Sequence, residues 1–258
     1  MHVETRGRGP SIALIHGWAM HCGLFAPLIE RLEDRWTLHL VDLPGHGHAH
    51  ASTAPLDPAA LSGALVDAAP GAVWLGWSLG GQFALRCVLD HAPRTRGLVM
   101  VASSPRFVQG DDWPHGVRPN LFGDFADALS RDFRATLEGF LALEALGSSH
   151  AQEELRRLRT QAFARGEPSE QALLHGLSLL DGTDLRAELP GLAVPSLWIS
   201  GRRDRLVPAG AMPAAAALAP NAQSLVIADA GHAPFMGAPD EVATAIDAFA
   251  RDCFASAR

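Results

Sequence analysis

The sequence contains no lysine and no tyrosine, because all 21 of its basic residues are arginine. Without a lysine amine the protein cannot form a Schiff base with a substrate or with pyridoxal phosphate, and it cannot complete a Walker A phosphate loop. Without a phenol it cannot use tyrosine as an acid, a base or a nucleophile. Composition alone therefore excludes several large classes of enzyme.

Cysteine and long apolar runs are also scarce. The three cysteines Cys22, Cys87 and Cys253 stand far apart without a CxxC pair, which argues against disulfides and cysteine–zinc sites and favours a reducing compartment. No stretch reaches the roughly 18 apolar residues of a membrane span, and the first residues lack the pattern of a secretory signal. We therefore expect a cytoplasmic protein that makes no contact with a membrane.

The charge balance argues against a broad nucleic-acid surface, because 21 basic and 28 acidic residues leave a net charge of −7. The chain has 258 residues, of which 48% are hydrophobic and 19% charged. Such a chain is long enough for one large domain, or for a domain that carries an insertion.

Short apolar runs alternate with segments of helical spacing along most of the chain. We expect buried strands at residues 11–15, 36–41, 73–77, 98–101, 195–200 and 224–227, with helices at 24–32, 56–68, 79–90, 209–219 and 239–254. Continuous apolar strands separated by helices are typical of a parallel sheet that is covered on both faces. The alternation stops between about residues 107 and 185, where helical spacing and higher charge indicate a helical insertion.

The segment Gly76-Trp77-Ser78-Leu79-Gly80 matches the pattern G-x-S-x-G. A predicted strand ends at Trp77 and a predicted helix begins at Leu79, so Ser78 occupies a tight strand-to-helix turn. The glycines leave room for that turn, because a side chain at either position would collide with neighbouring backbone. We therefore predict that Ser78 is a catalytic nucleophile rather than an incidental turn serine.

A serine hydroxyl is a weak nucleophile at neutral pH and needs a base beside it. Of the twelve histidines, His232 follows the last predicted strand and precedes the last predicted helix. A loop in that place can reach back over Ser78, so we predict that His232 is the base. The alternative is a loop histidine that faces solvent.

Asp204 follows the strand predicted at 195–200 and gives the chain order serine, aspartate, histidine. We predict that it orients His232. The alternative is that Asp204 only forms surface ion pairs with its neighbours Arg202, Arg203 and Arg205. Weaker candidates, none of which stands just beyond a strand in a loop of this form, are Asp181, Asp184 and Asp229.

Two further histidine-containing segments follow early strands. In His16-Gly17-Trp18 the backbone N–H of Trp18 could complete an oxyanion hole with the N–H of Leu79, while His16 would bond to nearby loop backbone. The loop that contains His46, His48 and His50 could place three imidazoles on one side for a metal ion, but it has no carboxylate or cysteine beside them. We expect a polar surface loop there and no metal site.

With these residues the chain resembles the α/β-hydrolase superfamily over nearly its whole length. A narrower resemblance, to the pimeloyl-[acyl-carrier protein] methyl ester esterases of biotin synthesis, is carried by Gly-Trp-Ser-Leu-Gly-Gly at 76–81, Ala-Ser-Ser-Pro at 102–105 and Phe-Leu-Ala-Leu at 140–143. The resemblance implies an α/β-hydrolase fold with a mostly parallel sheet, helices on both faces and a helical cap. The core would then be residues 1–108 and 184–258, and the cap residues 109–183.

The resemblance also implies an activity, the hydrolysis of the methyl ester of pimeloyl-acyl carrier protein with release of methanol, without a cofactor or metal. The residues that it places at the substrate are Trp18, Ser78, Leu79, His232 and the cap stretch Phe140, Leu141, Ala142, Leu143 and Glu144. Glu144 stands where the family carries a neutral amide.

The resemblance further implies that cap arginines bind the acidic carrier protein. Arg156 matches such a position, and Arg134, Arg157 and Arg159 are nearby basic residues, whereas Gly139 and Gln152 replace family arginines. Arginine suits this role because it pairs with phosphate and carboxylate in a bidentate manner. The alternative is a solvated helix in which Glu153 and Glu154 neutralise these arginines.

Other functions remain open on the residues alone. The chain could be a broad short-chain carboxylesterase, a carbon–carbon bond hydrolase, or a non-catalytic binding protein that keeps the pocket. Dehalogenases and epoxide hydrolases carry aspartate at the nucleophile position, so Ser78 disfavours them. We expect a monomer.

Overall fold

Seven strands form one sheet in the order β1-β3-β2-β4-β5-β6-β7 in the computed structural model, which describes residues 1–255. Their bounds are β1 His2–Gly7, β2 Ser11–Ile15, β3 Thr37–Asp42, β4 Val73–Trp77, β5 Gly97–Val101, β6 Ser196–Gly201 and β7 Ala222–Ile227. All neighbouring strands run parallel except β1, which pairs with β3 in the antiparallel sense. The predicted mostly parallel sheet is confirmed.

The register of the parallel strands brings their carboxyl ends to a common edge. Ile15 pairs with Gly76, Trp77 with Val101, and Val101 with Ile199. The loops that follow β2, β4 and β6 therefore emerge side by side, which is where ligands bind in such sheets. Strands β4, β5 and β6 are buried along their whole length, as expected of strands covered on both faces.

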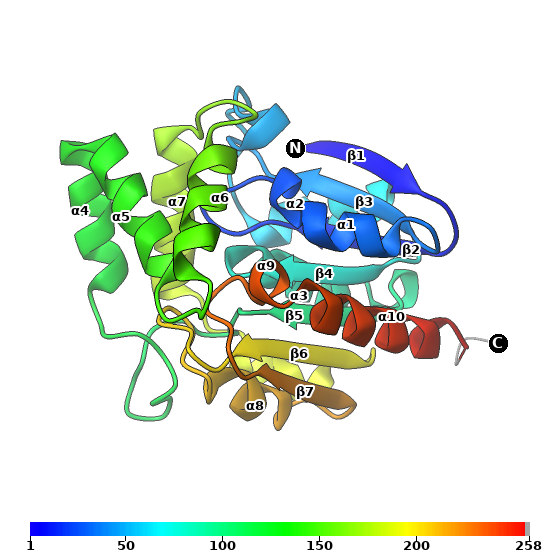
Figure 1. Cartoon of the computed structure of the whole chain (residues 1–258). Coiled ribbons are helices and arrows are strands. Elements are labelled where there is room, and N and C mark those ends of the chain that lie inside the picture. The colour runs from blue at the N-terminus through cyan, green and yellow to red at the C-terminus, as the bar shows by residue number, and fades with distance from the viewer. Residues whose placement is uncertain (256–258) are drawn as a thin grey trace.

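Helices cover both faces of the sheet (Figure 1). On one face lie α1 Ala26–Leu32, α9 Pro234–Gly237 and α10 Pro239–Ala255, which contact one another. On the other face α2 Pro58–Ala68 packs on α3 Leu79–Asp90, while α8 Ala211–Ala216 packs against β6 and β7. Short 3-10 helices lie at Cys22–Phe25, Ala92–Arg94, Gly47–Ala49 and Arg186–Gly191. No helix within residues 1–255 is long and apolar enough to cross a membrane.

Four further helices lie between β5 and β6 in the chain and stand together beside one end of the sheet (Figure 1). They are α4 Leu121–Arg131, α5 Phe133–Ala145, α6 Ala151–Ala162 and α7 Glu170–Gly182. The side chain of Asp132 caps α5 by accepting from the Ala135 amide, and Ser169 caps α7 by accepting from the Ala172 amide. These helices are the helical insertion that the sequence indicates.

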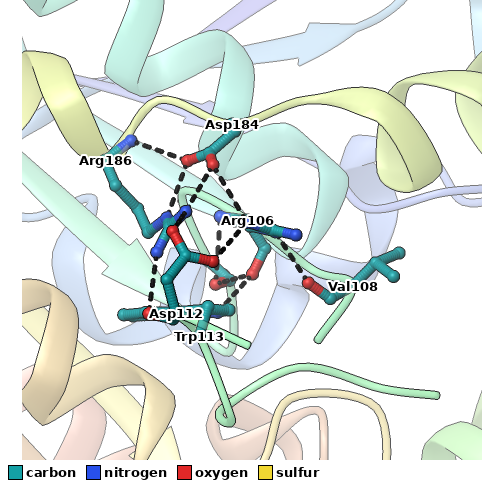
Figure 2. A network of polar contacts seen from close by, with 7 residues as sticks. Arg106, Val108, Asp112, Trp113, Asp184 and Arg186 are labelled. Carbon is teal, nitrogen blue, oxygen red and sulfur yellow. Dashed lines mark hydrogen bonds and ion pairs between the residues drawn. The ribbon is translucent and has the colours of Figure 1, made fainter. Parts of the chain in front are cut away.

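A charge cluster ties together the chain that leaves the sheet and the chain that returns to it (Figure 2). Arg106 Nη1 lies 3.1 Å from Asp112 Oδ1 and 3.3 Å from Asp184 Oδ2, while Arg186 Nη2 lies 2.7 Å from an oxygen of each aspartate. The Arg186 guanidinium also stacks 5.3 Å from the ring centre of Trp113. The cluster thus fixes the two crossings next to the predicted cap boundaries at residues 109 and 183.

Candidate active site

Ser78 lies in a strained turn between β4 and α3. Its backbone has φ 53° and ψ −124°, in the positive-φ region that L-residues rarely adopt. A Cβ on Gly76 would lie 2.4 Å from Gly81 Cα, and one on Gly80 would lie 2.3 Å from the Ile15 carbonyl oxygen. Both positions therefore require glycine, and the tight turn predicted for G-x-S-x-G is present.

The three residues predicted as a triad lie together. His232 Nε2 is 2.9 Å from Ser78 Oγ, and His232 Nδ1 is 2.9 Å from Asp204 Oδ2. The other Asp204 oxygen accepts from the amides of Leu206 and Val207 at 2.8 and 2.9 Å. A carboxylate at Nδ1 holds that nitrogen protonated, so the Nε2 lone pair faces the serine hydroxyl.

The surroundings of Asp204 exclude the surface ion-pair alternative. Its side chain is fully buried, whereas Arg203 reaches outward to Asp229, with 2.6 Å between Nη2 and Oδ1. Asp184, another weaker candidate, belongs to the charge cluster at the crossings. Asp204 therefore has the burial and the partners of an orienting carboxylate.

Both polar groups of the His232 backbone, the carbonyl and the amide, are hydrogen-bonded. The indole Nε1 of Trp77 donates to the His232 carbonyl oxygen at 2.8 Å, and the His232 amide donates to the Glu144 carbonyl oxygen at 3.4 Å. The imidazole is 1% exposed, so the solvent-facing alternative is wrong. Neither Trp77 nor Glu144 was predicted to hold the histidine, because both contacts join residues that are distant in sequence.

Two backbone amides sit next to the serine. Gly17 packs so closely that a Cβ there would lie 3.1 Å from Ser78 Cβ, and Trp18 follows it. The Leu79 amide begins α3, whose amino end carries partial positive charge. Neither the Trp18 nor the Leu79 amide donates to a protein acceptor within residues 1–255. Two free amides beside a nucleophile are what an oxyanion hole needs.

The indole of Trp18 connects this site to the inserted helices. Its Nε1 donates to the Leu173 carbonyl oxygen on α7 at 2.8 Å, and its ring meets Phe140 on α5 edge-to-face at 4.6 Å between ring centres. On α7, a Cβ at Gly176 would lie 2.6 Å from Trp18 Cδ1 and 3.1 Å from Leu79 Cδ2. Helices α5 and α7 therefore pack directly over the two residues predicted to form the oxyanion hole.

The cap stretch 140–144, which the resemblance places at the substrate, is only partly buried. Phe140, Leu141 and Glu144 are buried, Leu143 is half-buried and Ala142 is exposed. The placement of the whole stretch at the substrate stays a prediction, and Ala142 is the one residue of the five whose side chain is exposed. A helix turns by 3.6 residues, so five consecutive residues cannot all face one cavity.

Glu144 has an unusual environment that its position in the sequence did not reveal. The residue is fully buried, and neither carboxyl oxygen has a hydrogen-bond partner within residues 1–255. Burial, followed by the negative charge of Asp204, raises the pKa of the Glu144 carboxyl well above its usual value. This environment favours the neutral form of the Glu144 carboxyl over the ionised form.

The histidine-rich loop is not a simple surface loop. His46 is fully buried with its Nδ1 3.0 Å from the Pro44 carbonyl oxygen, whereas His48 and His50 are exposed. The surface-loop prediction is therefore wrong for His46. The part of the chain that the structure describes holds no group of three metal-ligating side chains. His16 bonds to backbone as predicted, with Nε2 accepting from the Leu43 amide at 3.1 Å.

The arginines predicted to meet a carrier protein differ in their partners. Arg134 pairs with Glu167 at 3.0 Å, Arg157 with Glu153 at 2.6 Å and Arg159 with Glu138 at 2.7 Å. Arg156 is exposed and has no ion pair within residues 1–255. The neutralised-helix alternative therefore holds for Arg157, while Glu154 is buried and bonds to Ser148 instead.

A groove of about 640 Å³ runs between α6 and the start of α1 and α10. Its lining includes Arg156, Arg157, Arg31, His150, Leu24 and Met236. Three acidic residues, Glu30, Glu153 and Glu154, also line it, so the groove combines charges of both signs with apolar groups next to the unpaired Arg156.

The comparisons with known proteins show the family to which the chain belongs. A family model described as the α/β hydrolase fold matches residues 10–239. A pimeloyl-[acyl-carrier protein] methyl ester esterase of Stenotrophomonas maltophilia (strain K279a) is 58% identical over 249 residues, which are 96% of each chain. The protein of the same name from Xanthomonas oryzae pv. oryzae (strain MAFF 311018) is 57% identical over 96% of this chain and 98% of its own.

Solved structures resemble the fold at low sequence identity. An esterase from Exiguobacterium antarcticum has a TM-score of 0.87 and 21% identity, over 97% of this chain and 95% of its own. The enol-lactonase from Burkholderia xenovorans LB400 has a TM-score of 0.81 and 20% identity, over 95% of both chains. These likenesses show the fold alone.

Proposed function

Because the chain belongs to the α/β-hydrolase fold family, and within it to the pimeloyl-[acyl-carrier protein] methyl ester esterases, we propose that it hydrolyses the methyl ester of pimeloyl-acyl carrier protein in biotin synthesis. The products are pimeloyl-acyl carrier protein and methanol. The single observation that carries a serine-esterase mechanism is the chain of contacts from Ser78 Oγ through His232 to Asp204, at 2.9 Å each.

The first half of the reaction forms an acyl-enzyme. His232 Nε2 takes the proton of Ser78 as Oγ attacks the ester carbonyl carbon, and Asp204 stabilises the imidazolium that results. The amides of Trp18 and Leu79 donate to the negative oxygen of the tetrahedral intermediate. When the intermediate collapses, His232 gives its proton to the departing methoxide, and methanol leaves.

The second half restores the enzyme. His232 takes a proton from water, the hydroxide attacks the acyl carbonyl carbon, and the ester bond to Ser78 breaks. His232 then returns the proton to Ser78 Oγ, and the pimeloyl carboxylate leaves on its carrier. A monomer suffices for this scheme, because every residue that it uses comes from one chain.

We propose Arg156 as the principal contact for the anionic carrier or its phosphopantetheine arm. Arg156 is exposed and unpaired, and it lines the groove beside α6, whereas Arg134, Arg157 and Arg159 already have acidic partners. An unpaired guanidinium can pair with phosphate or carboxylate without first breaking an existing ion pair.

The reaction is tested with purified protein, pimeloyl-acyl carrier protein methyl ester and a methanol readout. We expect turnover by the wild type and none by Ser78→Ala, with unchanged unfolding by urea. A fluorophosphonate probe should label the wild type at Ser78 and leave Ser78→Ala unlabelled. Turnover by Ser78→Ala would refute the mechanism. The substrate assignment would be refuted by a wild type that cleaves small esters, does not cleave pimeloyl-acyl carrier protein methyl ester and does not restore growth of a biotin-requiring strain.

The carrier contact is tested separately. Arg156→Ala should raise KM for the carrier-linked ester several-fold and leave hydrolysis of a small soluble ester unchanged, because the small ester lacks the carrier. Arg157→Ala is the matched control, since it lies on the same groove but already pairs with Glu153. Equal effects of both substitutions would refute the special role of Arg156.

A further inference from the structure

The loop that follows β5 reaches the turn that carries Ser78. Its first residue, Ala102, has φ +44°, which is rare for a residue other than glycine, and its amide donates to the Ile199 carbonyl oxygen at 2.8 Å. The next residue, Ser103, is 0% exposed, and its Oγ donates to the Ser78 carbonyl oxygen at 2.6 Å. This is the one hydrogen bond that the Ser103 hydroxyl makes within residues 1–255. A buried hydroxyl thus connects the bend after β5 to the nucleophile turn.

The first turn of α3 leaves room for this hydroxyl. A Cβ on Gly81 would lie 2.1 Å from Ser103 Oγ and 2.6 Å from Ser103 Cβ, so the contact requires glycine at that position. The Gly81 amide also donates to the Ser78 carbonyl oxygen, at 2.9 Å. This oxygen therefore accepts from two donors, one in α3 and one in the loop after β5, and both of its lone pairs are used.

The Ser78 carbonyl belongs to the same peptide unit as the N–H of Leu79. A peptide unit is planar, and in its trans form the C=O and the N–H point in opposite directions. No peptide bond within residues 1–255 is cis. Fixing the Ser78 carbonyl oxygen therefore also fixes the direction of the Leu79 N–H. A donor at the carbonyl oxygen polarises the peptide unit as well, which makes its N–H a stronger donor.

We propose that Ser103 is a positioning residue of the oxyanion hole. Through the Ser78 carbonyl it holds the Leu79 N–H toward the oxygen that becomes negative in the transition state. Donors that are already oriented stabilise such a charge because they do not have to turn as it develops. This inference rests on the proposed function, because it adds a residue to the same mechanism.

Removing the hydroxyl should slow the reaction without changing the apparent affinity for substrate. Ser103→Ala should lower kcat on a small soluble ester by about two- to tenfold, as expected for the loss of one neutral hydrogen bond. The loss should stay below the roughly hundredfold effect of removing an oxyanion donor itself, because the Leu79 N–H remains and the Gly81 amide still holds the carbonyl. Acylation and deacylation both place negative charge in the hole, so both steps should slow together and KM should change little.

Ser200→Ala is the matched control. Ser200 lies in β6 and is also 0% exposed, but its hydroxyl has no hydrogen-bond partner within residues 1–255. The substitution therefore removes the same group from a buried serine without removing a contact to the nucleophile turn. Both kcat and KM of Ser200→Ala should equal those of the wild type.

The deciding measurement is the inhibition constant of a short-chain alkyl trifluoromethyl ketone, taken beside kcat/KM and urea unfolding. Ser78 Oγ adds to the ketone carbon, His232 takes the serine proton, and the ketone oxygen becomes an anion in the oxyanion hole. Because this adduct resembles the tetrahedral intermediate, Ser103→Ala should weaken inhibition and lower kcat/KM by the same factor. A merely structural hydroxyl would affect the urea midpoint and leave both constants of the folded protein at their wild-type values.

Two results would overturn the proposal. One is that Ser103→Ala and Ser200→Ala have the same kcat/KM and the same inhibition constant. The other is that Ser103→Ala loses activity while its inhibition constant stays at the wild-type value. If Ser103→Ala does not fold, Ser103→Cys replaces it, because a thiol is a weaker donor than a hydroxyl. Both constants should then worsen by one common factor, and wild-type values in Ser103→Cys would overturn the proposal.

Labelling by a fluorophosphonate separates this inference from the proposed function. If the wild type is not labelled at Ser78, the serine-esterase mechanism itself fails. If the wild type is labelled and active but the Ser103 variants have its kcat/KM and its inhibition constant, only the positioning role of Ser103 fails.

Discussion

Replacing Glu144 by glutamine should make the protein more stable at neutral pH, and the gain should depend on pH in a defined way. The Glu144 carboxyl is buried without a partner and its pKa is raised well above the usual value, first by burial and then by Asp204. In the unfolded chain the same carboxyl ionises at its ordinary pKa of about 4.3. The folded state therefore holds one proton that the unfolded state has released.

The sign follows from this difference in bound protons. Above the unfolded pKa the unfolded state binds fewer protons, so the free energy of unfolding falls as pH rises, by about 1.4 kcal/mol per pH unit. The fall ends where folded Glu144 ionises. Glutamine removes this contribution. The free energy of unfolding of Glu144→Gln should therefore equal that of the wild type near pH 4. Above about pH 5 it should exceed the wild-type value by about 1.4 kcal/mol more for each pH unit.

The assay is urea unfolding of both proteins at matched pH values between about 4 and 7, with equal m values required for the comparison. Glu138→Gln on the same helix is the matched control, because its carboxylate is 44% exposed and pairs with Arg159. The free energy of unfolding of Glu138→Gln should differ from that of the wild type by a small amount, and this difference should not grow by about 1.4 kcal/mol per pH unit. A stability difference for Glu144→Gln that is flat with pH would show that Glu144 is ionised in the folded protein, and it would refute the reasoning.

Three further substitutions test other parts of the structure. Gly147→Ala should lower the free energy of unfolding in urea by about 1–3 kcal/mol, because residue 147 has a positive φ and a Cβ there would collide with the Arg203 carbonyl oxygen. Gly139→Ala on α5, where a Cβ would meet open space, should be neutral or stabilising. Asp204→Asn should lower kcat on the ester by about 10⁴-fold with unchanged folding, because an amide no longer holds His232 in the required tautomer; a loss below tenfold would contradict this. Burial lowers the pKa of His46 to about 4. The contribution of this residue should therefore lower the free energy of unfolding by about 3 kcal/mol as pH falls from about 6.5 to 4. Urea unfolding of His46→Gln should show a smaller loss of stability with falling pH in that range.

The sequence predicts those features that depend on local pattern. All six predicted strands lie within two residues of the observed bounds at both ends, as the strand predicted at 11–15 and observed as β2 Ser11–Ile15 illustrates. Continuous apolar runs of this length are typical of buried strands. The strand β1 His2–Gly7 was not predicted, because its residues are mostly polar and partly exposed at the sheet edge. Its pairing partner β3 is distant in the chain, since Val3 pairs with Val41, 38 residues later.

Features that depend on contacts between residues distant in the chain could not be predicted from the sequence. The burial of His46 follows from its packing beside His16, with ring centres 5.1 Å apart. The pKa of the Glu144 carboxyl is raised by its burial and then by the charge of Asp204, which comes from a separate segment of the chain. The strand-to-helix pattern could predict the turn at Ser78, but no pattern could show which side of α5 would pack against Trp18. For this reason the continuous stretch 140–144 included the exposed Ala142.

The position of Trp18 links the docking of the inserted helices to the chemistry proposed for the site. Its backbone amide is one of the two proposed donors to the oxyanion, while its indole is fixed by the Leu173 carbonyl oxygen on α7 and by the ring of Phe140 on α5. A shift of α7 would therefore pull on the same residue whose amide must stay within about 3 Å of the developing charge. The end of α5 and the turn after it also contact the other two triad loops, because the Glu144 carbonyl oxygen accepts from the His232 amide and Gly147 packs against the carbonyl oxygen of Arg203, the residue before Asp204. The inserted helices thus support the groups that flank Ser78, so substitutions at these contacts should lower kcat even where they do not touch the substrate.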